Sequence, residues 1–162
     1  MTEQKISSAY TSVNSKKVPA GFCKIRWAAL PQPFVLLDYG CGRYINHVKK
    51  FVEKKGGVYY GYDPYWVDKK DNETALSCNP DIIVCNNVLN VIQEDEIIEH
   101  ILELLLSCGK PMVIKIYEGD GSGVGKVTPK GYQRNQKTSS YAIPGKISHH
   151  NSVLTNNISY II

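Results

Sequence analysis

A carboxylate and two glycines follow one another at alternate positions where an apolar run of the chain ends. In the segment VLLDYGCGRY, residues 35–44, Asp38 precedes Gly40 and Gly42. Glycine allows the backbone to turn tightly and a ligand to approach it, and a helix that begins after the turn offers free N–H groups. A carboxylate at this place repels a pyrophosphate and attracts a cation. The motif therefore predicts a nucleotide-type site that prefers a positively charged ligand; its alternative is a plain strand-to-helix turn.

Two more polar positions stand where later strands are expected to end. Asp63 closes the second apolar segment, 25 residues after Asp38, and Asn86-Asn87-Val88 follows the third. Ligands of parallel sheets bind beyond the carboxyl ends of the strands, where the strand order reverses. We therefore expect these positions to meet, with Asp63 accepting both hydroxyls of a ribose and the asparagines on the opposite wall. Taken singly, these residues are also ordinary turn or capping residues.

The spacing of apolar residues predicts the elements that position this site. Continuous apolar runs indicate four buried parallel strands, over residues 34–39, 58–63, 81–91 and 111–117. Helical spacing predicts one helix from Ile45 to Gly56-Gly57 and another from Glu94 to Gly109. Strands that alternate with helices predict an α/β fold with a Rossmann-like sheet.

Composition indicates a single cytoplasmic domain of 162 residues, because 43% hydrophobic and 21% charged content are ordinary for a globular chain. No apolar run approaches the roughly 20 residues that span a bilayer, and the first residues lack a signal-peptide core. Five scattered cysteines without a C-x-x-C pair predict reduced thiols. We expect a polar arm over residues 1–25, a glycine- and lysine-rich active-site loop over 118–150, and a final strand, or a hairpin turning at Asn156-Asn157, over 152–162.

Together, the three motifs resemble those of the class I methyltransferases that use S-adenosylmethionine (SAM). DYGCG matches their D/E-x-G-x-G signature, Asp63 their ribose-binding acid and CNNVLNVI their fourth-strand motif, and the resemblance covers residues 35–117. The whole chain is also similar to small methyltransferase-like proteins of phages and prophages, through TSVNSKKVP, YDPYW, YEGDGSGVGKVT and QRNQKTSSY. The resemblance implies SAM as cofactor and S-adenosylhomocysteine (SAH) as product. The implied cofactor-binding residues are Asp38, Tyr39, Gly40, Cys41, Gly42, Asp63, Pro64, Asn86, Asn87 and Val88.

The chain departs from this family pattern in three places. Tyr44 stands where the family often has a third glycine, which predicts a wider turn or a tyrosine that covers the ligand. Residues 64–80 are too few for the helix, strand and helix of the full fold, so a sheet with a reduced edge after the second strand is expected. CNNVL stands where enzymes that methylate exocyclic amines carry Asp/Asn-Pro-Pro-aromatic. Cys85 lies in an apolar strand without a preceding proline, which indicates a buried structural thiol rather than a nucleophile.

Candidates for the acceptor side of the reaction follow the fourth predicted strand. Glu118 and Asp120 are candidate catalytic bases because they directly follow that strand. Arg134 and Lys137 alternate with tyrosines, a pattern that suits nucleic acid, and are candidate substrate-binding residues; a solvated basic loop is the alternative. The segment GDGSGVGK, residues 119–126, departs from the phosphate-loop pattern and predicts a mobile lid or an ordinary loop.

Basic residues gather toward the two ends of the chain. Residues 1–30 carry five Lys or Arg against one acid, residues 121–150 carry five against none, and the intervening residues carry nine against fourteen. This distribution predicts an anionic partner, such as nucleic acid, at the ends. The arm is also expected to fold over the cofactor, with Lys16 or Lys17 on its methionine carboxylate. No metal site is expected, since the adjacent His149 and His150 lack a third ligand.

These features favour a SAM-dependent methyltransferase that acts on nucleic acid rather than on a small molecule. A SAM- or SAH-binding module or partner subunit without transferase activity is the first alternative, because the chain is short and carries no catalytic signature. An NAD-dependent oxidoreductase is the second, and Asp38 and the absent third glycine argue against it.

Overall fold

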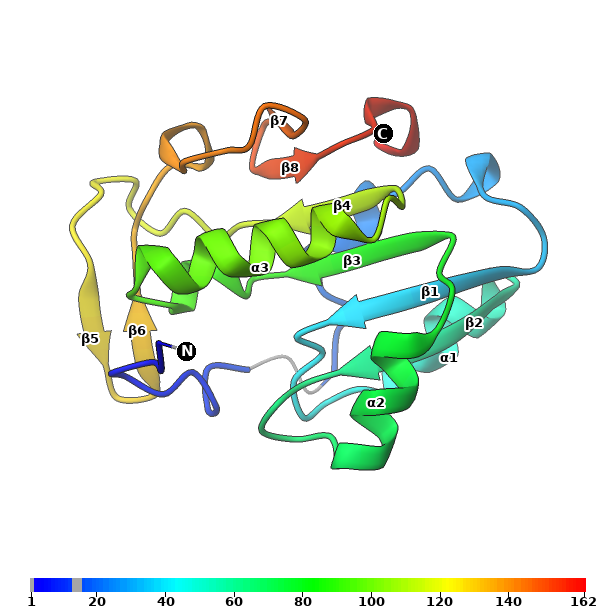
Figure 1. Ribbon diagram of the computed structural model, residues 1–162, viewed down its shortest axis with the longest axis horizontal. Helices are drawn as coiled ribbons and strands as arrows, with labels where there is room; N and C mark the ends of the chain where they lie inside the picture. Colours follow the sequence, from blue (N-terminus) through cyan, green and yellow to red (C-terminus); the bar gives the residue numbers. More distant parts are fainter. Residues whose placement is uncertain (1, 13–15) are drawn as a thin grey trace.

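A computed structural model describes residues 2–12 and 16–162, which fold as an α/β protein (Figure 1). The helices are α1 (Asn46–Lys54), α2 (Lys69–Ser77) and α3 (Asp95–Ser107). The strands are β1 (Phe34–Tyr39), β2 (Gly57–Tyr62), β3 (Ile82–Asn86), β4 (Met112–Lys115), β5 (Lys126–Thr128), β6 (Gly131–Gln133), β7 (Ser148–His150) and β8 (Val153–Thr155). Strands and helices alternate from β1 to β4, which confirms the predicted α/β class.

Six of these strands form one mixed sheet in the order β2-β1-β3-β4-β8-β7. The first four are parallel, whereas β8 is antiparallel to both β4 and β7. The chain runs outward from β1 to β2 and then returns past β1 to β3, so the strand order reverses between β1 and β3. Such a reversal leaves a crevice at the carboxyl ends of the two strands. Strand β2 is the edge, as predicted, because residues 64–80 contain α2 and no strand.

Successive strand residues point to opposite faces of the sheet and fill two separate cores. Leu37 packs in the core beneath α2 and α3, which lie on one face in Figure 1, whereas Leu36 packs on the face covered by α1. The predicted apolar stripe of α3 is buried at Ile98, Ile101, Leu102 and Leu105. Both faces of β1 and β3 are therefore covered, which holds the ends of these strands in fixed positions.

The polar arm is shorter than predicted, because its last residues belong to the core. Ala20–Lys24 forms a 3₁₀ helix, and the side chains of Phe22 and Ile25 are completely buried. Ile25 also forms an isolated antiparallel bridge with Ile161. The largely polar composition of the first 25 residues conceals these two apolar anchors.

The C-terminal part holds more strand structure than predicted. Residues 118–150 contain the β5–β6 hairpin and β7, so they are not one continuous loop. The terminal hairpin joins β7 to β8 and turns at Asn151-Ser152, not at Asn156-Asn157. Asn151 adopts a φ of 53°, which two-residue hairpin turns require and asparagine tolerates.

Within residues 2–12 and 16–162, no helix is both long and apolar enough to cross a membrane. In the same residues, no group of three or more His, Cys, Asp or Glu side chains is arranged to hold a metal ion. All five cysteines are free thiols.

Candidate functional site

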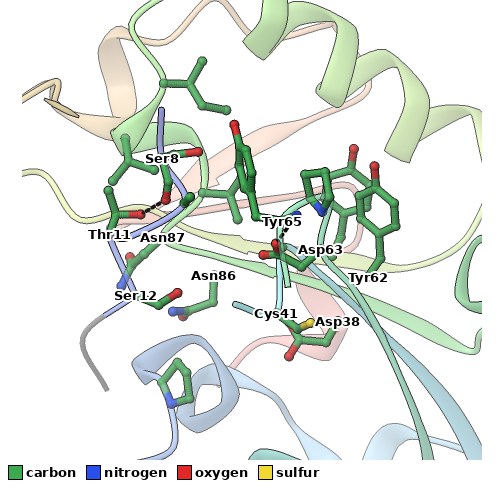
Figure 2. A pocket seen from close by; sticks show the side chains of 18 of the residues that line it. Ser8, Thr11, Ser12, Asp38, Cys41, Tyr62, Asp63, Tyr65, Asn86 and Asn87 are labelled. Carbon is green, nitrogen blue, oxygen red and sulfur yellow. Dashed lines mark hydrogen bonds between the residues drawn. The ribbon is translucent and has the colours of Figure 1, made fainter. Parts of the chain in front are cut away.

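A pocket opens at the carboxyl ends of β1, β2 and β3, at the reversal of strand order (Figure 2). Its volume is about 180 Å³, more than ten times the roughly 10–15 Å³ that a single water needs. Nine of the ten residues assigned to a cofactor from the sequence line the pocket, all except Gly42, so the fold brings together three motifs that lie up to 50 positions apart. It therefore has room for an organic ligand.

The turn after β1 depends on both of its glycines. Gly40 and Gly42 have φ values of 79° and 68°, in the left-handed region that favours glycine. A Cβ atom on Gly40 would overlap the Val88 side chain, and one on Gly42 would overlap the Ser12 hydroxyl. The Gly40 and Cys41 N–H groups donate to the Tyr62 carbonyl at 2.7 and 3.0 Å. The turn is thus fixed to the end of β2, and its positions 40 and 42 have no room for a side chain.

Asp38 is a buried carboxylate at the end of β1. It is 4% exposed, and its Oδ2 accepts a hydrogen bond of 2.6 Å from the Tyr59 hydroxyl of β2. Burial raises the pKa of Asp38 to about 7, the Tyr59 hydrogen bond opposes this rise, and the nearby charge of Asp63 adds to it. A cation in the pocket would stabilise the ionised form of Asp38, so this carboxylate favours a positively charged ligand.

Asp63 has a structural role in the turn after β2 and also lines the pocket. Its Oδ1 accepts from the N–H groups of Tyr65 and Trp66 at 2.8 and 3.1 Å. Its Oδ2 accepts from the Gly42 N–H at 2.9 Å. Because each carboxylate oxygen can accept two hydrogen bonds, Oδ2 keeps one lone pair for a ligand donor. The capping alternative raised by the sequence is therefore confirmed, and it leaves part of the carboxylate open to the pocket.

The asparagine loop after β3 forms the wall opposite Asp63. The predicted third strand ends at Asn86, and the chain continues through a left-handed residue, Asn87 with φ 55°, into a 3₁₀ helix. Asn86 Oδ1 accepts from the Gly21 N–H at 2.7 Å, which ties the loop to the segment after the arm. Asn87 Oδ1 is buried, and among the described residues it has no hydrogen-bond partner. It is an acceptor available to a ligand N–H or O–H group.

Aromatic and aliphatic side chains form the apolar part of the pocket. Tyr39 and Tyr62 stack with ring centroids 4.7 Å apart. Tyr44, for which the sequence predicts either a wider turn or a cover over the ligand, also lines the pocket. Further apolar lining comes from Val88, Val91, Ile92 and Ile101. The last three residues were not assigned to the site, because apolar residues in or beside a predicted strand or helix are equally well ordinary core positions.

The N-terminal arm supplies the outer side of the pocket. In Figure 2 the side chains of Ser8, Thr11 and Ser12 lie opposite Asp38, Tyr62 and Asp63. Gln4 and Ala9 also line the pocket. The segment that the sequence places over the cofactor, residues 11–17, contributes Thr11 and Ser12, and its residues 13–15 lie outside the described residues. Gln4, Ser8 and Ala9 were not predicted, because no local pattern distinguishes them from solvent-exposed residues. Lys16 and Lys17 are exposed and do not line the pocket.

The two candidate catalytic acids lie outside the pocket. Glu118 Oε1 accepts from the Thr138 N–H at 2.8 Å, and this bond is the main cause that lowers the pKa of Glu118. Asp120 is exposed, and its Oδ1 accepts from the Ser122 N–H at 2.9 Å, while hydrogen bonds with Ser122 lower the pKa of Asp120. Both carboxylates stabilise turns of the segment after β4.

Arg134 connects this segment to the start of α3 and is largely buried, with 12% of its side chain exposed. Nη1 donates to the carbonyls of Ile92 and Gln93 at 3.0 and 2.9 Å, and Nη2 pairs with Asp95 at 2.6 Å. Nε donates to Gln136 Oε1 at 2.9 Å. These internal partners occupy the guanidinium, whereas the other predicted substrate-binding residue, Lys137, is exposed.

Two cysteines lie in or next to the site without the properties of a nucleophile. Cys85 is completely buried in β3, as predicted, and burial raises the pKa of its thiol. Cys41 lines the pocket, and burial together with the charges of Asp38 and Asp63 raises the pKa of its thiol. Neither thiol is activated, because the thiolate is the reactive form and a raised pKa disfavours it.

A scan against protein-family models finds no family that matches this chain, and a search of curated proteins finds no relative.

Proposed function

We propose that this chain binds SAM in the pocket at the ends of β1, β2 and β3 and transfers its methyl group to an acceptor. The observation that carries the proposal is the charge of the pocket. Its described lining includes two buried carboxylates, Asp38 and Asp63, and no Lys or Arg. SAM carries a sulfonium and an ammonium group, both of which such a pocket attracts. The phosphates of NAD would instead be repelled by these carboxylates in their ionised form.

The remaining polar groups of the pocket suit an adenosine-type ligand. Asp63 Oδ2 keeps a lone pair for a hydroxyl donor, and Asn87 Oδ1 is a buried acceptor for an N–H donor. The stacked Tyr39 and Tyr62 rings offer an apolar surface for a flat base. These contacts support the resemblance of the motifs to class I methyltransferases, as does the position of the pocket at the reversal of strand order.

In this proposal the chain mainly binds and orients its ligands. SAM supplies a methyl group that its sulfonium activates toward a nucleophile. The protein holds the sulfur side near the ends of β1 and β3 and excludes water by closing the arm over the pocket. The acceptor we favour is nucleic acid, because basic residues gather in the first 30 residues and in residues 121–150.

A SAM- or SAH-binding module without transferase activity is the alternative. It is favoured by the position of Glu118 and Asp120, which do not line the pocket and are used in turns. Labelled SAM incubated with the chain and with pools of DNA, RNA and cell extract separates the two functions. Label in an acceptor supports the methyltransferase, whereas SAH binding without transfer supports the module.

Calorimetric titration with SAM, SAH and NADH tests the cofactor itself. We expect SAM and SAH to bind and NADH not to bind. Asp38→Asn should weaken SAM binding roughly tenfold, since one charge-assisted contact contributes about 1.5–3 kcal/mol. Asp71→Asn, an acid-to-amide change at an exposed position on α2, is the matched control and should bind SAM like the wild type. Failure of the wild-type chain to bind SAM and SAH would contradict the proposal.

A further inference from the structure

The N-terminal arm, residues 2–12, is fastened over the pocket by side chains of the turns after β1 and β2. Trp66 Nε1 donates to the Ala9 carbonyl at 2.6 Å, and the Trp66 ring meets the Tyr10 ring edge to face at 5.4 Å. The Arg43 guanidinium lies over both rings, 5.4 Å from the centre of Trp66 and 5.7 Å from that of Tyr10. It also lies 4.8 Å from the ring of Tyr44, which lines the pocket.

The arm is fixed again near its start, by two acidic side chains at the beginning of α3. The Lys5 N–H donates to Glu94 Oε1 at 2.9 Å, and the Thr2 hydroxyl donates to Glu96 Oε2 at 2.9 Å. Gln4, between these two contacts, turns toward the pocket. Its Oε1 is buried, and among the described residues it has no hydrogen-bond partner. A buried acceptor without a partner costs about 1–3 kcal/mol, so a ligand that supplies a donor gains from it.

We propose that the arm is a closed wall of the binding site, through which Gln4 supplies a hydrogen-bond acceptor to the ligand, and that Trp66 holds this wall shut. Gln4 Oε1 and Asn87 Oδ1 are then two amide acceptors in one pocket, and together they select a ligand that carries N–H or O–H donors. The contribution of Gln4 to SAM or SAH affinity rests on the proposed function. The closure by Trp66 does not, because it is a property of the free chain.

The pocket thiol of Cys41 reports on the wall in the absence of any ligand. Cys41 lies between Gly40 and Gly42 in the turn that Ser12 contacts, and it is half-buried in the pocket wall of the free chain. In a Cys23→Ser, Cys108→Ser background, which removes the two exposed thiols, mass mapping follows the alkylation of Cys41 by iodoacetamide. Trp66→Phe keeps an aromatic ring and removes the indole N–H. We expect it to raise the alkylation rate about fivefold, the effect of losing a hydrogen bond of about 1 kcal/mol.

Trp27→Phe is the matched control for this experiment. Trp27 packs against Phe34 and Phe51 on the other face of the sheet, so its replacement should leave the Cys41 rate unchanged while the chain stays folded. An equal rate in the wild-type and Trp66→Phe chains would overturn the closure by Trp66, whether or not SAM binds.

Gln4→Met tests the acceptor, because it keeps the length of the side chain and removes its polar atoms. We expect SAH to bind three- to tenfold more weakly by calorimetry, while the Tm of the free chain stays equal or rises because no internal partner is lost. Glu3→Gln, on the exposed neighbour of Gln4, should change neither quantity. A lower Tm with unchanged SAH affinity would show a structural role and overturn the acceptor. If the wild-type chain binds no SAH, the proposed function fails with the acceptor, and the alkylation result still decides the closure.

Discussion

At the scale of single residues, the site depends on buried polar groups and on backbone conformations that few residue types adopt. Asp38 is a carboxylate held at 4% exposure, and Gly40 and Gly42 occupy backbone conformations that other residues avoid. Asn87 has a left-handed backbone, and its side-chain oxygen is buried without a partner among the described residues. Strained and under-satisfied groups that share one pocket are typical of ligand sites.

The stability of the chain should fall between about pH 4 and pH 7 because of Asp38. Burial raises the folded-state pKa of Asp38 to about 7, above the ordinary value of 3.8, so the folded state binds this proton more tightly than the unfolded state. The stabilisation of the folded state by this proton is complete below pH 3.8 and is lost as the pH rises through 7. It amounts to at most roughly 4 kcal/mol of unfolding free energy. Urea unfolding of the wild type and of Asp38→Asn measures it as the difference between their slopes against pH. Equal slopes would contradict the shift.

Tyr59→Phe should move the same transition to higher pH. The Tyr59 hydroxyl donates to Asp38 and stabilises its ionised form, so its removal raises the pKa of Asp38 further. The titration of Asp38, followed by carboxyl NMR, checks this directly. An unchanged or lower pKa in Tyr59→Phe would show that the hydroxyl does not stabilise the carboxylate.

Gly42→Ala should both strain the backbone and displace the arm. The backbone φ of 68° at this position is unfavourable for alanine, and the added Cβ atom would overlap the Ser12 hydroxyl. We expect a loss of about 1–2 kcal/mol in unfolding free energy, together with faster hydrogen exchange in residues 8–12. Gly109→Ala has a similar φ of 63° with no atom within 4 Å, so it reproduces the strain and should leave exchange in the arm unchanged. Slow exchange in the arm of Gly42→Ala would show that Ser12 does not press against this turn.

At the scale of elements, the segment after β4 is organised around α3. Arg134 joins the carbonyls before α3, the Asp95 carboxylate and Gln136, and its guanidinium lies 5.5 Å from the Tyr141 ring. The Arg134 N–H donates to the Asn90 carbonyl at 2.8 Å. Because Asn90 follows the asparagine loop, this segment supports the same loop that lines the pocket. Its basic residues therefore include one internal connector and several exposed lysines.

Arg134→Lys should destabilise the chain by about 1–3 kcal/mol. A lysine cannot reproduce the fork that contacts two carbonyls and a carboxylate at once, and it leaves the part-buried Ile92 carbonyl without its donor. Asp95→Asn removes only the ion pair, whose acid is 77% exposed, and should cost less than about 1 kcal/mol. Chemical denaturation of both variants makes the comparison. Equal losses would assign the effect to the ion pair rather than to the carbonyl contacts.

At the scale of the whole molecule, the charge distribution bears on the proposed nucleic-acid acceptor. The pocket is lined by carboxylates, whereas Lys130 and Lys137 are exposed on the segment after β4. The pocket would therefore present carboxylates to a cationic cofactor, and the exposed lysines would present positive charge to an anionic acceptor.

Binding of a single-stranded oligonucleotide should weaken steeply with salt if the basic segments contact phosphates. Each contact contributes about 0.7 to the slope of log K against log salt concentration, so Lys130→Ala or Lys137→Ala should lower the slope by about that amount. Lys50→Ala, at an exposed position of α1 in the acidic part of the sequence, should leave the slope unchanged. Fluorescence anisotropy measures the binding of all three variants at roughly 50 to 200 mM salt, a range across which such salt effects are large. An equal loss in all three would indicate only a general charge effect.

The alternation of strands and helices from β1 to β4 and the residues around the pocket follow from local sequence patterns. The buried runs around Leu36 and Val84 and the stripe of α3 can each be recognised within a few residues, because burial on both faces requires continuous apolar strands and 3.6-residue periodicity requires spaced apolar positions. The motif of Asp38, Gly40 and Gly42 can also be recognised locally, since its tight turn needs glycine at two positions that are two residues apart. Tertiary contacts between distant segments carry no such pattern. The Tyr59 bond that holds Asp38, the ion pair of Arg134 with Asp95 and the bond from Trp66 to the arm join residues 21 to 57 positions apart. Only the folded chain determines them, because hydrogen bonding and packing at these distances depend on how the sheet brings the segments together.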